Sequence, residues 1–245
     1  MSQDTVEIPL RDEKIAYGIL TGSWRNDLVV IVHGFNSFVD YALYNTAAQY
    51  FSHMGLSVLR FALYAAAPNG RRANTGTIDA HAKDLEDIIR FARTQGASSV
   101  HLIGHSAGAY TIVSASHYGV SSISLWDPSD PDVPFLSTTQ LPYVAELDAY
   151  VYPDGIDLLL SRQYVESIER FRLQSYLLQW QQVPTLLVSA GAGILVDATH
   201  RYQTYLENIT EVQSVEIPRA DHYFMNDGCL ELLLQTTYQW INRFY

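Results

Sequence analysis

The stretch VHLIGHSAGA occupies residues 100–109, where a short apolar run meets a glycine-rich turn and then a helix-like apolar pattern. It contains the form G-x-S-x-G, with Ser106 between Gly104 and Gly108. A strand that turns directly into a helix leaves no space for a Cβ at these glycines, and it strains the backbone of the central serine. The stretch therefore predicts a nucleophile elbow, in which the helix N-terminus favours negative charge developing at Ser106. The alternative interpretation is a glycine-rich turn that happens to contain a serine.

Strand-like and helix-like segments alternate on both sides of this stretch, which is typical of a parallel sheet with crossover helices on its two faces. Residues 28–32 form a continuous apolar run, as expected of a strand buried on both faces. The expected strands cover residues 6–10, 14–20, 28–32, 56–61, 100–104, 122–126, 183–189 and 211–217. The expected helices cover residues 39–53, 77–91, 106–117, 162–180, 196–206 and 229–243.

Residues 131–182 interrupt the alternation. The segment is rich in proline, and residues 149–160 predict two short strands around a Pro-Asp-Gly turn. The helix expected at residues 162–180 follows these strands and completes the segment.

Taken together, these features resemble the α/β-hydrolase superfamily over nearly all 245 residues. The resemblance implies the α/β class and the α/β-hydrolase fold, with a mostly parallel central sheet, helices on both faces and a small cap inserted after the sixth strand. On this basis residues 1–130 and 183–245 form the core, and residues 131–182 form the cap or lid. Lids of this kind shape a substrate pocket and exclude water.

Three aromatic residues are candidates to line such a pocket. Trp126 ends the strand before the predicted cap, and Tyr150 and Tyr152 lie within it. The alternative for each is that it only packs the cap against the core.

The resemblance also implies an oxyanion hole. His33-Gly34-Phe35 directly follows the buried strand at residues 28–32, and an H-G-f motif here supplies one backbone N–H donor in the superfamily. The two donors carried over are the N–H groups of Phe35 and of Ala107, the residue after the serine. The alternative for His33-Gly34 is a simple turn at a strand end.

A serine hydroxyl needs a base that removes its proton and a group that orients the base. The superfamily order is nucleophile, acid, histidine, and of eight histidines only His222 follows the last expected strand. His222 is therefore the expected base. His105 flanks the serine and is expected to pack under the elbow. A metal pair with His101 is disfavoured, because residues four apart on a strand project poorly toward one ion.

The acid has two candidates. The usual family pattern after the strand at residues 183–189 places the acid at Gly193, which has no carboxylate. Asp127 is favoured, because Leu125-Trp126-Asp127-Pro128 resembles the Leu-Asp-Pro acid segment of pancreatic-type lipases. Asp197, four residues past the vacant position, is the alternative. Either carboxylate could instead serve structure, Asp127 in a turn and Asp197 as a helix N-cap.

Composition excludes several function classes. The net charge of −11 and pI near 5.0 argue against binding to nucleic acid or to anionic membrane surfaces. No apolar run is long enough to span a membrane, and no signal-peptide pattern is present. The single cysteine, Cys229, excludes an internal disulfide and fits a reducing compartment, so a cytoplasmic location is expected. No metal-binding cluster, phosphate-binding loop or dinucleotide fingerprint occurs, so no metal and no cofactor is expected.

The sequence thus predicts a serine hydrolase that cleaves a small-molecule carboxylic ester through an acyl-enzyme on Ser106. A thioesterase or an amide hydrolase would use the same residues. A different class, a catalytically silent binding protein with the hydrolase fold, has the vacant Gly193 as its best support. Nothing in the sequence indicates an oligomeric state.

Overall fold

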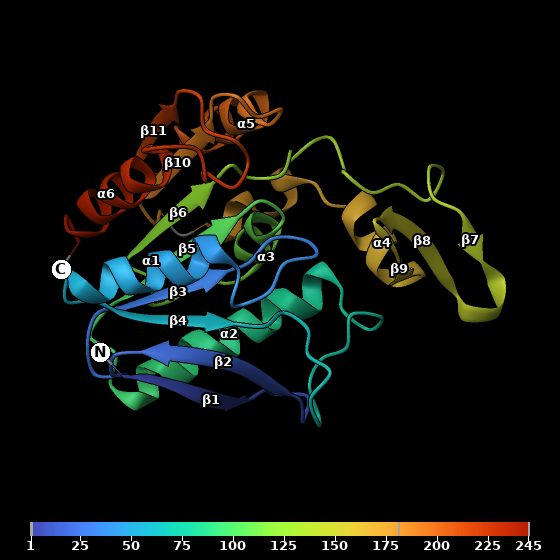
Figure 1. The fold of residues 1–245 in the computed structure, drawn as a ribbon, viewed down its shortest axis with the longest axis horizontal. Helices are drawn as coiled ribbons and strands as arrows, with labels where there is room; N and C mark the ends of the chain where they lie inside the picture. Colours follow the sequence, from blue (N-terminus) through green and yellow to red (C-terminus); the bar gives the residue numbers. More distant parts are fainter. Residues whose placement is uncertain (1, 181, 245) are drawn as a thin grey trace.

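The computed structural model describes residues 2–180 and 182–244, and its core is an eight-stranded sheet (Figure 1). The strands are β1 (Gln3–Pro9), β2 (Ile15–Thr21), β3 (Leu28–Val32), β4 (Ser57–Phe61), β5 (Val100–His105), β6 (Ser122–Trp126), β10 (Thr185–Ala190) and β11 (Val212–Ile217). Their spatial order is β1-β2-β4-β3-β5-β6-β10-β11. β1 and β2 form an antiparallel hairpin, and β2 is antiparallel to β4. All other neighbours are parallel, so the carboxyl ends of β3, β5, β6, β10 and β11 meet at one edge.

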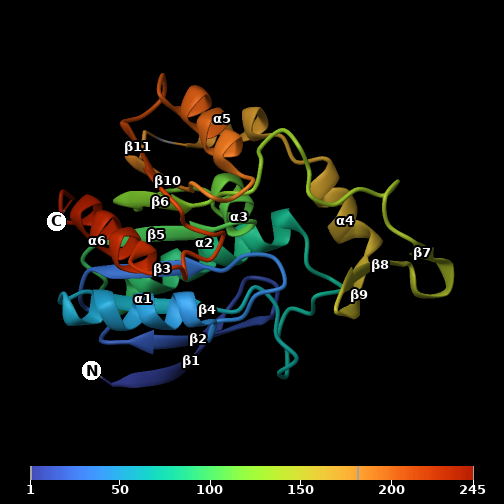
Figure 2. The same ribbon diagram turned by 45° about the horizontal axis from the view of Figure 1, so that its top comes forward.

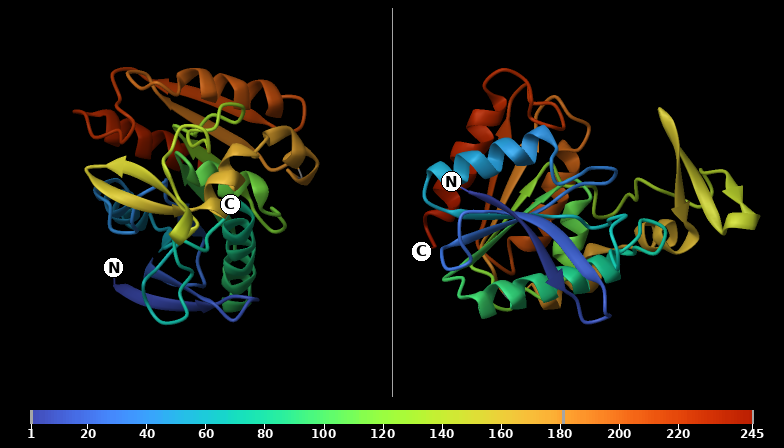
Figure 3. Two further views of the ribbon diagram at one scale, coloured as in Figure 1. Left: turned by 90° about the vertical axis from the view of Figure 1, so that its right-hand side faces the viewer. Right: turned by 60° about the horizontal axis from the view of Figure 1, so that its bottom comes forward.

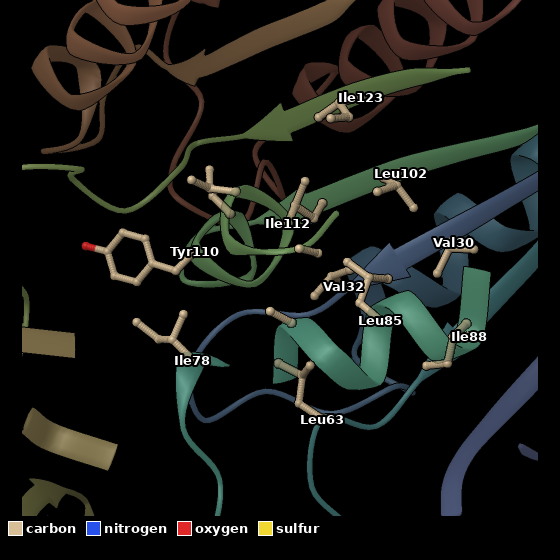
Figure 4. Close-up of a cluster of buried hydrophobic side chains, with 14 of the residues drawn as sticks. Val30, Val32, Leu63, Ile78, Leu85, Ile88, Leu102, Tyr110, Ile112 and Ile123 are labelled. Carbon is tan, nitrogen blue, oxygen red and sulfur yellow. The ribbon is translucent and has the colours of Figure 1, made fainter. Parts of the chain in front are cut away.

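Helices cover both faces of the sheet. α1 (Ala42–His53) and α6 (Cys229–Ile241) pack on one face, and α2 (Ile78–Gln95), α3 (Gly108–Ser114) and α5 (Val196–Leu206) pack on the other. Side chains alternate between the two faces along β3, since Val30 and Val32 join the α2–α3 cluster in Figure 4 and their neighbours join the α1–α6 cluster. The predicted mostly parallel sheet with helices on both faces is therefore confirmed.

An inserted segment (residues 131–182) joins β6 to β10. It contains β7 (Tyr143–Val144), the 3₁₀ helix η1 (Ala145–Leu147), β8 (Ala149–Asp154), β9 (Ile156–Ser161), α4 (Arg162–Glu169) and the 3₁₀ helix η2 (Leu173–Gln179). β7, β8 and β9 form an antiparallel sheet of their own. In Figures 1 to 3 this sheet projects from the side of the core where the central strands end. The division of the chain into a core and a cap stays a prediction.

The helices expected at residues 162–180 and 106–117 are both shorter than the sequence predicts. The expected helix at residues 162–180 is split into α4 and η2, because the backbone of Arg172 is extended and the Phe171 ring stacks on Tyr110 of α3 at a centroid distance of 4.1 Å. The helix after the elbow ends at Ser114 rather than at residue 117. His117 Nε2 donates to the carbonyl of Ile112 at 2.7 Å, which satisfies a helix-terminal acceptor.

The described residues, 2–180 and 182–244, include no helix that is both long and apolar enough to cross a membrane.

Five histidines of the described residues are buried. Desolvation lowers the pKa of His33 and His101 to about 4, and that of His81 and His105 to about 3. Below pH 6.5 these histidines are therefore protonated in the unfolded chain but stay neutral in the folded chain. The stability that is present above pH 6.5 is consequently lost as the pH falls.

We expect the free energy of unfolding to fall by about 1.4 kcal/mol per pH unit for each such histidine between pH 6 and pH 5. Urea unfolding at pH 7, 6 and 5 measures this slope. His101→Asn, whose amide can still bond to Ser99 and Ser122, should reduce the slope. The matched change at an exposed histidine, His53→Asn, should leave it unchanged, and equal slopes in the two variants would contradict the assignment.

Candidate active site

Ser106 lies in the turn between β5 and α3 with a φ of 54°, a left-handed value that is strained for a serine. Little space is left for a side chain on either side of the turn, and at Gly108, which packs on backbone, glycine is required. A Cβ at Gly108 would lie 2.4 Å from the carbonyl oxygen of Val32, and one at Gly104 would lie 2.7 Å from Ile112 Cδ1. The packing of α3 against the ends of β3 and β5 thus holds the serine at the carboxyl edge of the sheet.

Asp127, which is buried, and His222, which is partly exposed, form a pair at the same edge. Asp127 Oδ2 lies 2.6 Å from His222 Nδ1, and the aspartate is fully buried. Its other oxygen, Oδ1, accepts from the backbone N–H of Ala190 at 3.0 Å. Because an ionised carboxylate only accepts, Nδ1 carries the proton in a neutral imidazole. His222 Nε2 is then the ring nitrogen that can take up a proton.

The structure places Asp127, and not Asp197, at His222. Asp197 is exposed in the first turn of α5, where its charge acts on Arg201, and it is not the N-cap either, since Leu195 holds that position. Gly193, the usual position of the acid in the family, helps to explain why Asp127 can reach His222. A Cβ built on Gly193 would lie 3.5 Å from Asp127 Oδ2, so the carboxylate that comes from the end of β6 reaches the space beside the glycine.

Short contacts bring the serine next to this pair. The Ser106 N–H donates to the carbonyl of Trp126 at 3.0 Å, so the serine borders the residue that precedes Asp127. On the other side, the ring of His105 lies 4.8 Å from the His222 ring between centroids. Residues from the ends of β5, β6 and β11 are thereby gathered around one point.

Ser129 is a neighbour that the sequence did not indicate. Its hydroxyl lies 3.5 Å from Ser106 Oγ, and its N–H donates to the Ser106 carbonyl at 3.1 Å. The signal for it was its place two residues after the candidate acid, on the same strand end.

Both predicted oxyanion donors lie beside the serine. A Cβ on Gly34 would be 3.1 Å from Ser106 Cβ, so the loop after β3 passes directly over the elbow. Phe35, which follows Gly34, and Ala107 line the same narrow cavity. Ala107 is the N-cap residue of α3, at the helix end whose first N–H groups have no intrahelical acceptor. The arrangement can therefore direct backbone N–H groups at a developing oxyanion.

A buried hydrogen-bond chain, which the sequence did not reveal, links this loop to the histidine. The carbonyl of His222 accepts from His105 Nε2 at 2.8 Å, and His105 Nδ1 lies 2.8 Å from the hydroxyl of Tyr44. The low pKa of His105, caused mainly by desolvation, keeps its ring neutral, so Nδ1 accepts and Tyr44 donates. The Tyr44 oxygen in turn accepts from the Gly34 N–H at 3.1 Å. His105 therefore connects the two loops that flank Ser106.

Of the three aromatic candidates for substrate binding, Tyr152 comes nearest to the site. Its ring lies 5.2 Å from the Phe35 ring between centroids. Tyr150 is buried in the inserted segment and packs on Tyr143 at 5.0 Å. Trp126 does not fit the prediction, because its ring is fully buried among the α1–α6 cluster and its indole N–H donates to Thr237 of α6 at 3.0 Å.

No group of three or more potential metal-ligating side chains is found in the part of the chain that the structure describes. The predicted absence of a metal or cofactor stays a prediction. His101, considered as a ligand with His105, hydrogen-bonds through its ring to Ser99 and Ser122.

Comparison with known proteins gives a consistent fold. Residues 29–232 match the sequence model described as the alpha/beta hydrolase family. The structure of Est1E from Butyrivibrio proteoclasticus with ferulic acid bound has a TM-score of 0.80 and 15% identity, over 97% of this chain and 98% of that one. The esterase domain of a Rhodothermus marinus protein has a TM-score of 0.72 and 18% identity, over 100% of this chain and 99% of that one. Dienelactone hydrolase from Anabaena variabilis has a TM-score of 0.70 and 19% identity, over 99% of this chain and 98% of that one. No curated protein matches the sequence.

Tyr44→Phe tests the buried chain. Removing the hydroxyl leaves the Gly34 N–H and His105 Nδ1 without their partner, so we expect a loss of about 1–3 kcal/mol in the free energy of unfolding. Urea unfolding at pH 7 measures the loss. Tyr50→Phe, at a partly exposed tyrosine of the same helix, is the matched control and should change stability by less than about 0.5 kcal/mol. Equal losses in the two variants would contradict the chain.

Proposed function

The chain belongs to the alpha/beta hydrolase family, and from this premise we propose that it is a serine hydrolase that cleaves small-molecule carboxylic esters through an acyl-enzyme on Ser106. The observation that carries the proposal is the 2.6 Å contact between Asp127 Oδ2 and His222 Nδ1, beside a serine with a strained backbone. A buried carboxylate paired with a histidine is the arrangement that orients a general base.

In the proposed reaction, Ser106 Oγ attacks the carbonyl carbon of the ester while His222 Nε2 takes the serine proton. Asp127 holds the imidazole in the required tautomer and stabilises the imidazolium that forms. The N–H groups of Phe35 and Ala107 bind the oxyanion of the tetrahedral intermediate. His222 then protonates the leaving alcohol. Water, activated by the same histidine, hydrolyses the acyl-enzyme and restores the serine.

The vacant Gly193 gives little support to a silent binding protein. The carboxylate of Asp127 lies 3.5 Å from the place of a Gly193 Cβ, so a carboxylate is available to His222 without the usual acid. A protein that only bound a ligand would have no need of the strained serine, the buried acid and the histidine together.

The inserted segment acts as a lid in this proposal. Tyr152 and Tyr164 come from the segment and pack on the Phe35 ring, so the segment borders the proposed oxyanion hole. A covering of aromatic rings would reduce the access of water to the acyl-enzyme. We also propose a cytoplasmic location, supported by the single cysteine, Cys229, which is free and buried.

Labelling with a fluorophosphonate, read by intact mass, tests the nucleophile. We expect one adduct on the wild-type protein and none on Ser106→Ala. Ester hydrolysis should fall about 10⁶-fold in Ser106→Ala, because the triad serine is lost. A folded wild-type protein that takes up no label would favour the binding protein instead.

The acid is tested by a matched pair of variants. Asp127→Asn should slow both labelling and hydrolysis of 4-nitrophenyl acetate by about 10⁴-fold, because an amide at this position favours the wrong histidine tautomer. Asp197→Asn should keep the wild-type rates within about twofold, because this side chain is exposed on α5. The reverse ranking would make Asp197 the acid.

A further inference from the structure

Ser129 contacts the proposed nucleophile but has no part in the proposed reaction. Its hydroxyl oxygen lies 3.5 Å from Ser106 Oγ, and the residue is 5% exposed. Within residues 2–180 and 182–244, each of these two hydroxyls has the other as its only hydrogen-bond partner. The hydroxyl proton of Ser129 is therefore available to Ser106 Oγ.

Backbone contacts hold Ser129 in this place from both sides. Asp127 has a φ of 41°, a left-handed value that turns the chain sharply at the end of β6. After the turn, the N–H of Ser129 donates to the carbonyl of Ser106 at 3.1 Å. On the other side, the carbonyl of Asp130 accepts from the Tyr110 hydroxyl at 2.5 Å. Because residues on both sides are fixed, Ser129 cannot leave the elbow without breaking these contacts.

Ser129 approaches the nucleophile from the side opposite the oxyanion loop. Strand β5, which ends at the elbow, pairs with β3 on one side and with β6 on the other. The loop after β3 carries Phe35, a proposed oxyanion donor, whereas Ser129 follows β6. The hydroxyl of Ser129 is therefore placed to act on Ser106 Oγ itself rather than on the oxyanion.

Ser106 Oγ becomes negatively charged when its bond to the acyl carbon breaks. In hydrolysis of the acyl-enzyme, water adds to this carbon and gives a proton to His222. The bond between the carbon and Ser106 Oγ then breaks, its electron pair goes to Oγ, and His222 Nε2 gives the proton to that oxygen. A hydroxyl forms a shorter and stronger hydrogen bond to a charged oxygen than to a neutral one. The 3.5 Å contact is therefore expected to tighten at this step, as catalytic hydrogen bonds often do.

Taking Ser106 as the nucleophile of the proposed function, we propose that the Ser129 hydroxyl donates a hydrogen bond to Ser106 Oγ as this oxygen leaves the acyl-enzyme. Ser129 keeps its own proton throughout, so it adds no proton transfer to the reaction. During acylation by an activated ester, Oγ is the attacking atom, and a hydrogen bond donated to it gives little help. Loss of the hydroxyl should therefore slow deacylation more than acylation.

Ser129→Ala tests this difference between the two halves of the reaction. Full-length protein is acetylated with 4-nitrophenyl acetate, and the decay of the acetyl-enzyme is followed by intact mass after acid quenching. We expect this decay to be about tenfold slower in Ser129→Ala than in the wild-type protein, because a hydrogen bond to a charged oxygen is lost. Fluorophosphonate labelling, which requires only attack by Ser106, should keep its wild-type rate.

Two further variants separate the hydroxyl from general damage to the fold. Ser129→Thr keeps the hydroxyl and should recover most of the deacylation rate. If it does not fold, Ser129→Cys, a weaker donor, should give an intermediate rate. Ser124→Ala is the matched control on β6. Ser124 is 1% exposed, and within residues 2–180 and 182–244 its hydroxyl has no partner, so its loss should change neither half of the reaction.

Equal slowing of labelling and deacylation in Ser129→Ala would show that the hydroxyl only supports the elbow, and the proposed role would be wrong. Wild-type decay of the acetyl-enzyme in Ser129→Ala would also overturn the role, while the hydrolase would stand. The proposed function fails by a different result. A wild-type protein that takes up no fluorophosphonate and releases no 4-nitrophenol would overturn Ser106 as the nucleophile, and the role of Ser129 with it.

Discussion

The site depends on one fully buried carboxylate. Asp127 lies at 0% exposure, where an unpaired charge would cost several kcal/mol. Its oxygens are paired with the Ala190 N–H at the end of β10 and with His222 after β11, and its own N–H donates to Val188. The same contacts that make the buried charge tolerable therefore hold three parts of the site together. Loss of any one partner would expose the others to an uncompensated charge.

One neutral buried histidine, His105, connects the parts that surround this carboxylate. His105 donates to the His222 carbonyl and accepts from Tyr44, whose oxygen also binds the Gly34 N–H. The arrangement joins the loop that carries Phe35 to the loop that carries His222. Every polar atom in this chain of hydrogen bonds has a partner. The hydrogen bonds can therefore lie in the core and still hold both loops rigidly. The variable residue of the G-x-S-x-G pattern thus has a structural role of its own.

The loop after β3 is one of the places where the inserted segment contacts the core. Phe35 contacts Phe135, Tyr152 and Tyr164 of the segment, and the Asn36 amide donates to Asp154 at 2.5 Å. A shift of the segment would consequently be transmitted to the proposed oxyanion donor at Phe35.

The sequence by itself determined most of the helices and strands, the elbow at Ser106, and the chain order of the serine and the histidine. These features follow from local rules: a glycine pair around Ser106 where side chains would be crowded, continuous apolar runs in buried strands, and one histidine after the last strand. Only the tertiary structure places Asp127 rather than Asp197 beside His222, because the carboxylate of Asp127 is buried against the histidine whereas Asp197 lies exposed on α5. It also turned the Trp126 ring away from the site and split the helix expected at residues 162–180. Such outcomes arise from contacts between residues far apart in the chain, which no local pattern encodes.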